Sequence, residues 1–138
     1  MEIEKVMEKD SVLAIIIYSH AVTEGIRFFT PDHYSLQVGK HNHPKGKIIN
    51  PHRHMPVKIA RTGSLQETLY IEEGKVKIIF YNSEGMRLEE KILGAGDMIL
   101  LMEGGHGFEF LEPTKMIEIK QGPYVPESKK SLNIEGKK

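Results

Sequence analysis

Short runs in which apolar and polar residues alternate follow one another along most of the chain, and turn residues separate them at fairly regular spacing. Such runs, when rich in β-branched and aromatic residues, are typical of β-strands. The pattern predicts strands over residues 12–18, 26–30, 34–38, 47–54, 57–61, 67–72, 75–81, 87–93, 97–102, 107–111 and 115–120. Residues 2–9 fit either a strand or one turn of helix, and no longer segment carries a helical apolar stripe.

The spacing of the turns indicates an all-β fold. Glu73-Gly74 and the residues 82–85 separate three alternating runs, so residues 67–93 are predicted to form a three-stranded meander. Many short strands at this spacing favour a sandwich or a small barrel over an α/β fold.

The size of the chain fits one domain. Its 138 residues are enough to bury a real core, and we expect a single domain over residues 1–125. Residues 126–138 are rich in Lys and nearly free of apolar side chains, so we expect a poorly ordered tail or one packed on the surface.

Composition excludes several classes of protein. Lys and Arg together number 19, as do Asp and Glu, so the chain lacks the basic field of a nucleic-acid-binding protein. The predominance of Glu and Lys among the charged residues is typical of thermophilic proteins. The apolar run at 12–18 is too short to span a bilayer, and we expect a cytoplasmic protein that binds no membrane. Cysteine is absent, so any metal must be held by His and carboxylate groups.

Histidines and a carboxylate recur on predicted strand faces. His52 and His54 are two residues apart, so they point the same way if their segment is a strand. Glu67 shares a strand face with Leu69, and a carboxylate among core residues is best explained by a cation or a salt bridge. His106 similarly shares a face with Phe108 and Phe110, after a Gly-Gly step.

These residues fall into two known motifs. The first, G(X)5HXH(X)3-4E(X)6G, is matched by His52-Arg53-His54 and by the stretch from Glu67 to Gly74. The second, G(X)5PXG(X)2H, is matched between Gly96 and His106. Over roughly residues 34–120 the chain resembles the cupins. The string from Gly104 to Glu109, followed by residues 118–124, also resembles a subgroup of small single-domain cupins. Three departures stand out: twelve residues separate His54 from Glu67, Met102 replaces the motif proline, and the step from Gly104 to His106 is one residue short.

The resemblance implies a double-stranded β-helix that holds a divalent metal, Zn, Fe, Mn or Ni, on His52, His54, Glu67 and His106. The insertion before Glu67 leaves open whether this carboxylate is a ligand. The alternative is a metal-free cupin in which His52, Glu67 and His106 carry out acid–base catalysis or form hydrogen bonds.

Further residues are candidates for substrate contacts. His41 and His43 form a second HXH pair, which the flanking Gly, Lys and Pro residues place in a loop, either on the surface or over the pocket mouth. Arg61 could bind a carboxylate or phosphate through bidentate hydrogen bonds from its guanidinium group. Gln121 shares the face of Ile117 and Ile119 and could enter the barrel.

The function that the resemblance implies is a metal-dependent isomerase or epimerase for a small polar metabolite, a sugar or sugar-nucleotide derivative. A non-catalytic module that binds a small molecule and an Fe(II) dioxygenase are the alternatives. We also expect a homodimer, formed by edge pairing of the strand at residues 12–18.

Overall fold

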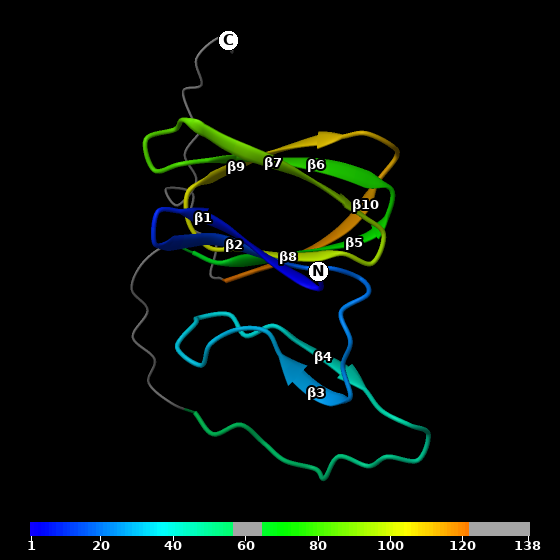
Figure 1. Ribbon diagram of the computed structural model, residues 1–138. Helices are drawn as coiled ribbons and strands as arrows, with labels where there is room; N and C mark the ends of the chain where they lie inside the picture. Colours follow the sequence, from blue (N-terminus) through cyan, green and yellow to red (C-terminus); the bar gives the residue numbers. More distant parts are fainter. Residues whose placement is uncertain (57–64, 122–138) are drawn as a thin grey trace. The chain divides into compact units, whose positions relative to one another are not determined.

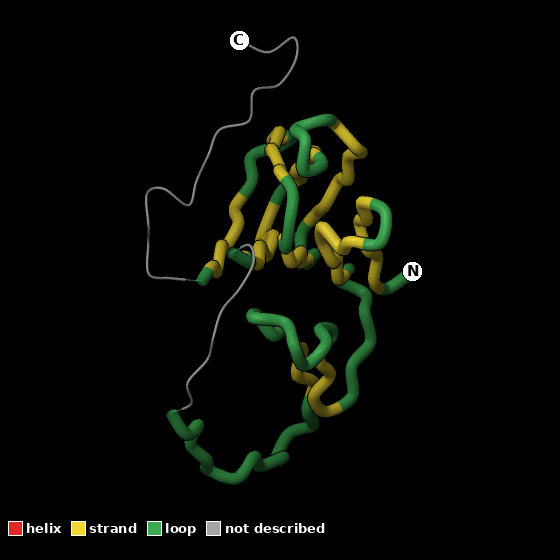
Figure 2. Tube along the Cα trace, turned by 90° about the vertical axis from the view of Figure 1, so that its left-hand side faces the viewer, coloured by secondary structure: helices red, strands yellow, loops and turns green. Residues whose placement is uncertain are grey.

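The computed structural model describes residues 1–56 and 65–121, and the only regular structure in these residues is β-strand (Figures 1 and 2). The all-β prediction is therefore confirmed for this part of the chain. No helix in it is long and apolar enough to cross a membrane. The described residues form two compact units, residues 1–21 with 65–121 and residues 22–56. The strand predicted at 57–61, with Arg61, and the tail at 126–138 lie outside the described residues.

The first unit contains two antiparallel sheets (Figure 1). One has five strands in the order β1-β2-β8-β5-β10, namely β1 (Ile3–Glu8), β2 (Ser11–Ile17), β8 (Met98–Leu101), β5 (Glu67–Glu73) and β10 (Lys115–Lys120). The other has three strands in the order β7-β6-β9, namely β7 (Arg87–Gly94), β6 (Lys75–Tyr81) and β9 (Gly105–Phe110). No closed barrel is identified among the described residues.

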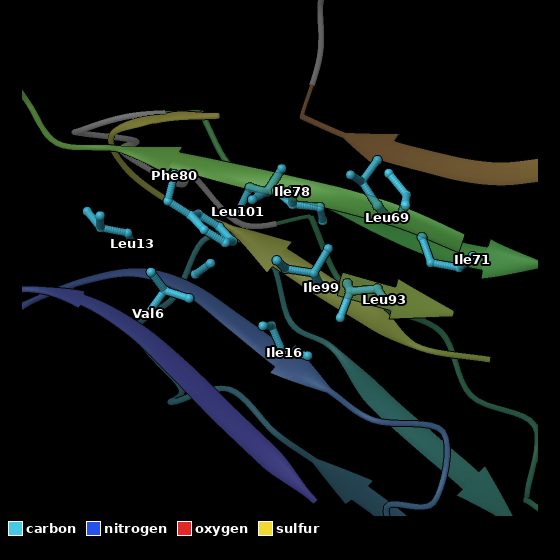
Figure 3. Packing of buried hydrophobic residues seen from close by; sticks show 12 residues of the cluster. Val6, Leu13, Ile16, Leu69, Ile71, Ile78, Phe80, Leu93, Ile99 and Leu101 are labelled. Carbon is cyan, nitrogen blue, oxygen red and sulfur yellow. The ribbon is translucent and has the colours of Figure 1, made fainter. Parts of the chain in front are cut away.

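The core of this unit lies between the two sheets (Figure 3). Because successive side chains of a strand point to opposite faces, each strand contributes alternate residues to it. The five-stranded sheet supplies Ile16, Leu69 and Ile99, and the three-stranded sheet supplies Ile78 and Phe80, all of them buried. Burying each such side chain stabilises the fold by roughly 1.5–3 kcal/mol, which makes this contact the main source of stability.

The meander predicted for residues 67–93 is only half correct. β6 and β7 form the expected hairpin, but β5 pairs with β8 and β10 in the other sheet. The turn at Gly74 carries the chain from one sheet to the other. Gly74 has a φ of +95°, and a Cβ atom there would lie 2.4 Å from the carbonyl oxygen of Pro113. Only glycine fits this crossing.

The N-terminal residues form strand β1, which pairs with β2. Strand β2 lies between β1 and β8 and is hydrogen-bonded on both sides. The expectation that residues 12–18 form an edge strand open to a second copy is therefore wrong. The homodimer itself stays a prediction, and it would need a different surface.

The second unit contains the hairpin of β3 (Gly25–Phe28) and β4 (Gly39–Asn42). The strand predicted at 34–38 is instead part of the connecting loop. The side chain of Gln37 closes this loop, since its Nε2 donates hydrogen bonds to the carbonyl oxygens of Pro31 at 2.9 Å and Tyr34 at 2.8 Å.

No strand is present in residues 43–56, so the strand predicted at 47–54 is wrong as well. Pro44, Pro51 and Pro56 lie in this stretch, and each lacks the N–H group that a strand ladder needs.

Candidate functional site

Strand β9 places His106 on the inner face of the three-stranded sheet. In its register with β6, His106 lies opposite Phe80, and Phe108 lies opposite Ile78. Both partners on β6 belong to the core, and Phe108 packs against it. The ring centroids of His106 and Phe108 are 5.5 Å apart. The predicted shared face of these two residues is confirmed.

Strand β5 places Glu67 on the inner face of the opposite sheet. Glu67 is the first residue of β5, and Leu69 and Ile71, which follow at alternate positions, are buried in the core. The carboxylate therefore lies at the end of a strand, on the face that lines the interior. This position also matches the prediction.

The two sheets bring Glu67 and His106 into contact. Nε2 of His106 lies 2.9 Å from Oε1 of Glu67, although 38 residues separate them in sequence. The side chains are 29% and 17% exposed, respectively, so both are screened from bulk water yet reachable from it. The hydrogen bond from His106 lowers the pKa of Glu67, against the opposing effect of burial.

A third ionisable group, Glu118, adjoins this pair. Glu118 lies on β10 opposite Leu69, and its side chain shares a hydrogen bond with Glu67. Burial, and then this hydrogen bond, raise the pKa of Glu118. Two carboxyl groups this close resist being ionised together, so the second of them loses its proton at a higher pH than the first. The site thus contains an ionised carboxylate, a carboxyl group that holds its proton to higher pH, and an imidazole.

The sequence analysis missed Glu118, although a signal for it exists. Met116 packs against the core, and Glu118 follows it at the next position on the same strand face. Glu67 shows the same pattern, since it is a carboxylate that alternates with core residues along its strand.

Gln121 lies at the end of the same pair of strands. Its side-chain Oε1 accepts a hydrogen bond from the backbone N–H of Gln66 at 2.8 Å. Ile117 and Ile119 face away from the core, since Met116 faces it, so the expectation that all three point into the interior is wrong for the two isoleucines. Gln121 instead ties β10 to the start of β5, beside Glu67.

His52 and His54 belong to the second unit, and they are close to each other. Their ring centroids are 5.3 Å apart, and Nδ1 of His52 lies 3.0 Å from the carbonyl oxygen of Asn50. Within residues 1–56 and 65–121, no group of three or more His, Cys, Asp or Glu side chains is arranged to hold a metal ion.

His41 and His43 form the other HXH pair of the second unit. The expectation of a loop is wrong for His41, which lies in β4 opposite Ile26 of β3. Nδ1 of His41 and Nε2 of His43 are 3.1 Å apart, within hydrogen-bond distance.

Comparisons of this chain with models of known protein families, with curated proteins and with solved structures find no match.

Proposed function

We propose that this protein is an enzyme that moves protons on a small polar metabolite, with sugar derivatives as the substrate class, and that Glu67 and His106 form the centre of its active site. The observation that carries the proposal is the 2.9 Å contact between these residues, which come from opposite sheets. A cupin-like double-stranded β-helix is the fold that we propose. Two facing antiparallel sheets and the motif positions of Glu67 and His106 support it.

The three ionisable groups fit isomerisation or epimerisation next to a carbonyl group. Glu67 orients the imidazole of His106 through the contact at Nε2, the usual role of a carboxylate beside a catalytic histidine. His106 removes a proton from the carbon next to the carbonyl, and Glu118 donates a proton to the carbonyl oxygen. Return of the two protons then gives the isomer or epimer, with no net oxidation or reduction. Glu118 suits the acid role because its raised pKa leaves a larger fraction of it protonated than of an ordinary carboxyl group.

The alternative to these metal-free proton transfers is the metal enzyme that the resemblance implies, with His52, His54, Glu67 and His106 as ligands for Zn, Fe, Mn or Ni. The 2.9 Å separation of Glu67 and His106 is compatible with two ligands of one cation. A bound cation would polarise the carbonyl oxygen of the substrate. It would also occupy Glu67 and His106, so the metal-dependent and the metal-free mechanism are alternatives.

The test of the reaction measures exchange of a substrate proton for deuterium from the solvent. A thermal-shift screen of sugars, sugar phosphates, sugar nucleotides and keto acids, with and without Zn²⁺ or Mn²⁺, selects ligands. Each ligand is then incubated with the enzyme in D₂O, and NMR follows loss of the proton next to its carbonyl group. We expect exchange with the wild-type protein and a loss of about 10²–10⁴-fold in the His106→Gln variant.

Ligands that bind without any exchange would favour the non-catalytic binding module. Exchange that persists unchanged in the His106→Gln variant would remove this residue from the mechanism.

The test of the metal is elemental analysis of protein purified without added metal. If the metal enzyme is correct, we expect the double variant His52→Ala, His54→Ala to contain one equivalent of divalent metal fewer than the wild type. Full metal content in this variant would contradict the proposed ligand set.

A further inference from the structure

The HXH pair at the end of β4 brings two imidazole nitrogens close together on the second unit. Nδ1 of His41 and Nε2 of His43 are 3.1 Å apart, and the two rings are nearly perpendicular, with centroids 5.3 Å apart and an interplanar angle of 66°. Both nitrogens therefore point at the small space between the rings. His41 is exposed, and His43 is partly buried.

The hairpin holds this arrangement in place. The backbone of His41 is paired with Ile26 in the β3–β4 ladder. Between the two histidines, the side chain of Asn42 donates a hydrogen bond from Nδ2 to the carbonyl oxygen of Thr23 at 2.8 Å. Asn42 is thus tied to its own hairpin, and alternation leaves the two imidazoles together on the other face.

The distance between the nitrogens suits a metal ion. Zn²⁺ binds imidazole nitrogen at about 2.0–2.1 Å, so two such ligands that subtend 90–110° at the metal lie about 2.9–3.4 Å apart. The observed 3.1 Å falls within this interval, so the spacing fits a shared metal ion once the two rings turn from their hydrogen bond toward it. Imidazole is a ligand of Zn²⁺, Cu²⁺ and Ni²⁺, whereas Ca²⁺ and Mg²⁺ prefer oxygen.

We propose that His41 and His43 form a two-histidine chelate site for a late first-row divalent cation, with water in the remaining coordination positions. The site lies wholly on the β3–β4 hairpin and its continuation, and it does not depend on the proposed function. Affinity should follow the order Zn²⁺ < Cu²⁺ and Ni²⁺ < Cu²⁺, because N-donor sites obey the Irving–Williams series.

The probe for this site is Cu²⁺ alone, added to the metal-free full-length protein. Calorimetry measures the affinity, and electron paramagnetic resonance counts the nitrogen ligands. We expect the resonance spectrum of the wild type to contain a component from Cu²⁺ bound to two imidazole nitrogens. Loss of a direct ligand in His41→Ala or His43→Ala should weaken Cu²⁺ binding at this site at least as much as the roughly 10–100-fold that loss of an outer-shell partner typically costs.

Two control variants make the test specific. The double variant His52→Ala, His54→Ala removes the other HXH pair and should leave the component intact. The variant His33→Ala removes a histidine that packs edge-on against Tyr34 and not against a second imidazole, and it should also have no effect. A circular dichroism melt verifies that each variant folds.

Three results would overturn the proposal. The first is an unchanged Cu²⁺ component in the double variant His41→Ala, His43→Ala. The second is loss of the component in the His52→Ala, His54→Ala variant, which would mean that both pairs serve one site. The third is a component with only one nitrogen ligand in the wild type. None of these results depends on Glu67 or His106, so failure here leaves the proposed active site standing.

Discussion

On one side of the two-sheet unit, Nζ of Lys91 on β7 donates a hydrogen bond to Glu4 of β1 at 2.7 Å, and on the other side His106 of β9 meets Glu67 of β5 at 2.9 Å. Each contact joins the five-stranded sheet to the three-stranded sheet, and each uses an acid from the former and a base from the latter. The side chains are similarly half-buried, between 17% and 29% exposed. The two contacts differ in the chemistry of their third member.

At the first contact the third member is Tyr18, whose hydroxyl donates to Glu4 at 2.6 Å. Burial, and then this hydrogen bond, raise the pKa of Tyr18 to about 12, while the pairing lowers the pKa of Glu4 and raises that of Lys91. No group in this cluster changes its charge near neutral pH, so it can only hold the sheets together.

At the second contact the base is an imidazole, and the third member is a second carboxyl group, Glu118. Imidazole can serve as a proton acceptor or a proton donor in catalysis, and the pKa of Glu118 is raised above its usual value. This side of the unit can therefore exchange protons with a bound molecule. The comparison indicates that a polar contact between the two sheets is not by itself a candidate functional site. The groups in contact must also be able to gain or lose a proton.

The largest expected effect tests the core that both contacts share. Replacing Phe80, which lies opposite His106 on β6, with Ala should lower the free energy of unfolding by about 3–5 kcal/mol. Denaturant unfolding measures this loss. Hydrogen exchange should show both sides of the unit losing protection together, and loss confined to the side of His106 would show that the two contacts do not rest on a common core.

The next effect separates the contacts by stability. Glu4→Gln breaks an ion pair between two groups that are charged at neutral pH, and it should cost about 1–2 kcal/mol. Glu67→Gln should cost less, since Glu67 already competes with Glu118 for hydrogen bonds. Because pairing lowers the folded-state pKa of Glu4, its contribution is present above the unfolded pKa and is lost as the pH falls through the folded one. Urea unfolding of both variants at neutral and acidic pH measures the difference, and equal costs would contradict it.

A smaller effect concerns Glu118. Burial raises its pKa in the folded state above the value in the unfolded state. Between these two values the folded protein binds more protons, so stability falls as the pH rises through that interval. Glu118→Gln removes this cost and should stabilise the protein at neutral pH by less than about 1 kcal/mol, because solvent screens an exposed group. Melting temperatures against pH measure the gain, which should disappear in acid. A loss of stability at neutral pH would show that Glu118 contributes favourably as an anion.

The smallest effect is spectroscopic. Ultraviolet absorbance of the phenolate should show one tyrosine titrating near pH 12, assigned by its absence in Tyr18→Phe. In Glu4→Gln the pKa should fall only part of the way to its usual value, because burial is the larger cause of the shift. A complete return to that value would show that Glu4 alone causes it.

The part of this arrangement that the sequence predicts is local. Alternation correctly placed Glu67 with Leu69 and His106 with Phe108 on inward faces, because strand geometry fixes the period of two. The contact between Glu118 and Glu67 depends on the register of β10 against β5, more than 40 residues apart, which no local pattern specifies. The assignment of β5 and β6 to different sheets likewise depends on the turn at Gly74.

The second unit shows a different limit. The strands predicted at 34–38 and 47–54 had suitable composition, yet neither forms. In the first, the side chain of Gln37 donates hydrogen bonds to loop carbonyl groups, and in the second, Pro51 lacks the backbone N–H that a strand ladder needs. In such short segments a side-chain hydrogen bond to the backbone, or a missing backbone donor, overrides propensity.

The most direct test of the account compares two isosteric variants, Glu67→Gln and Glu4→Gln, with the wild type. Each is titrated with the sugar derivative that most stabilises the wild-type protein, and the melting temperature is recorded. The account predicts that Glu4→Gln keeps the full ligand-induced shift from its lower starting temperature, while Glu67→Gln loses most of it. A full shift in Glu67→Gln, or its loss in Glu4→Gln alone, would contradict the claim that the side of Glu67 and His106 is the functional one.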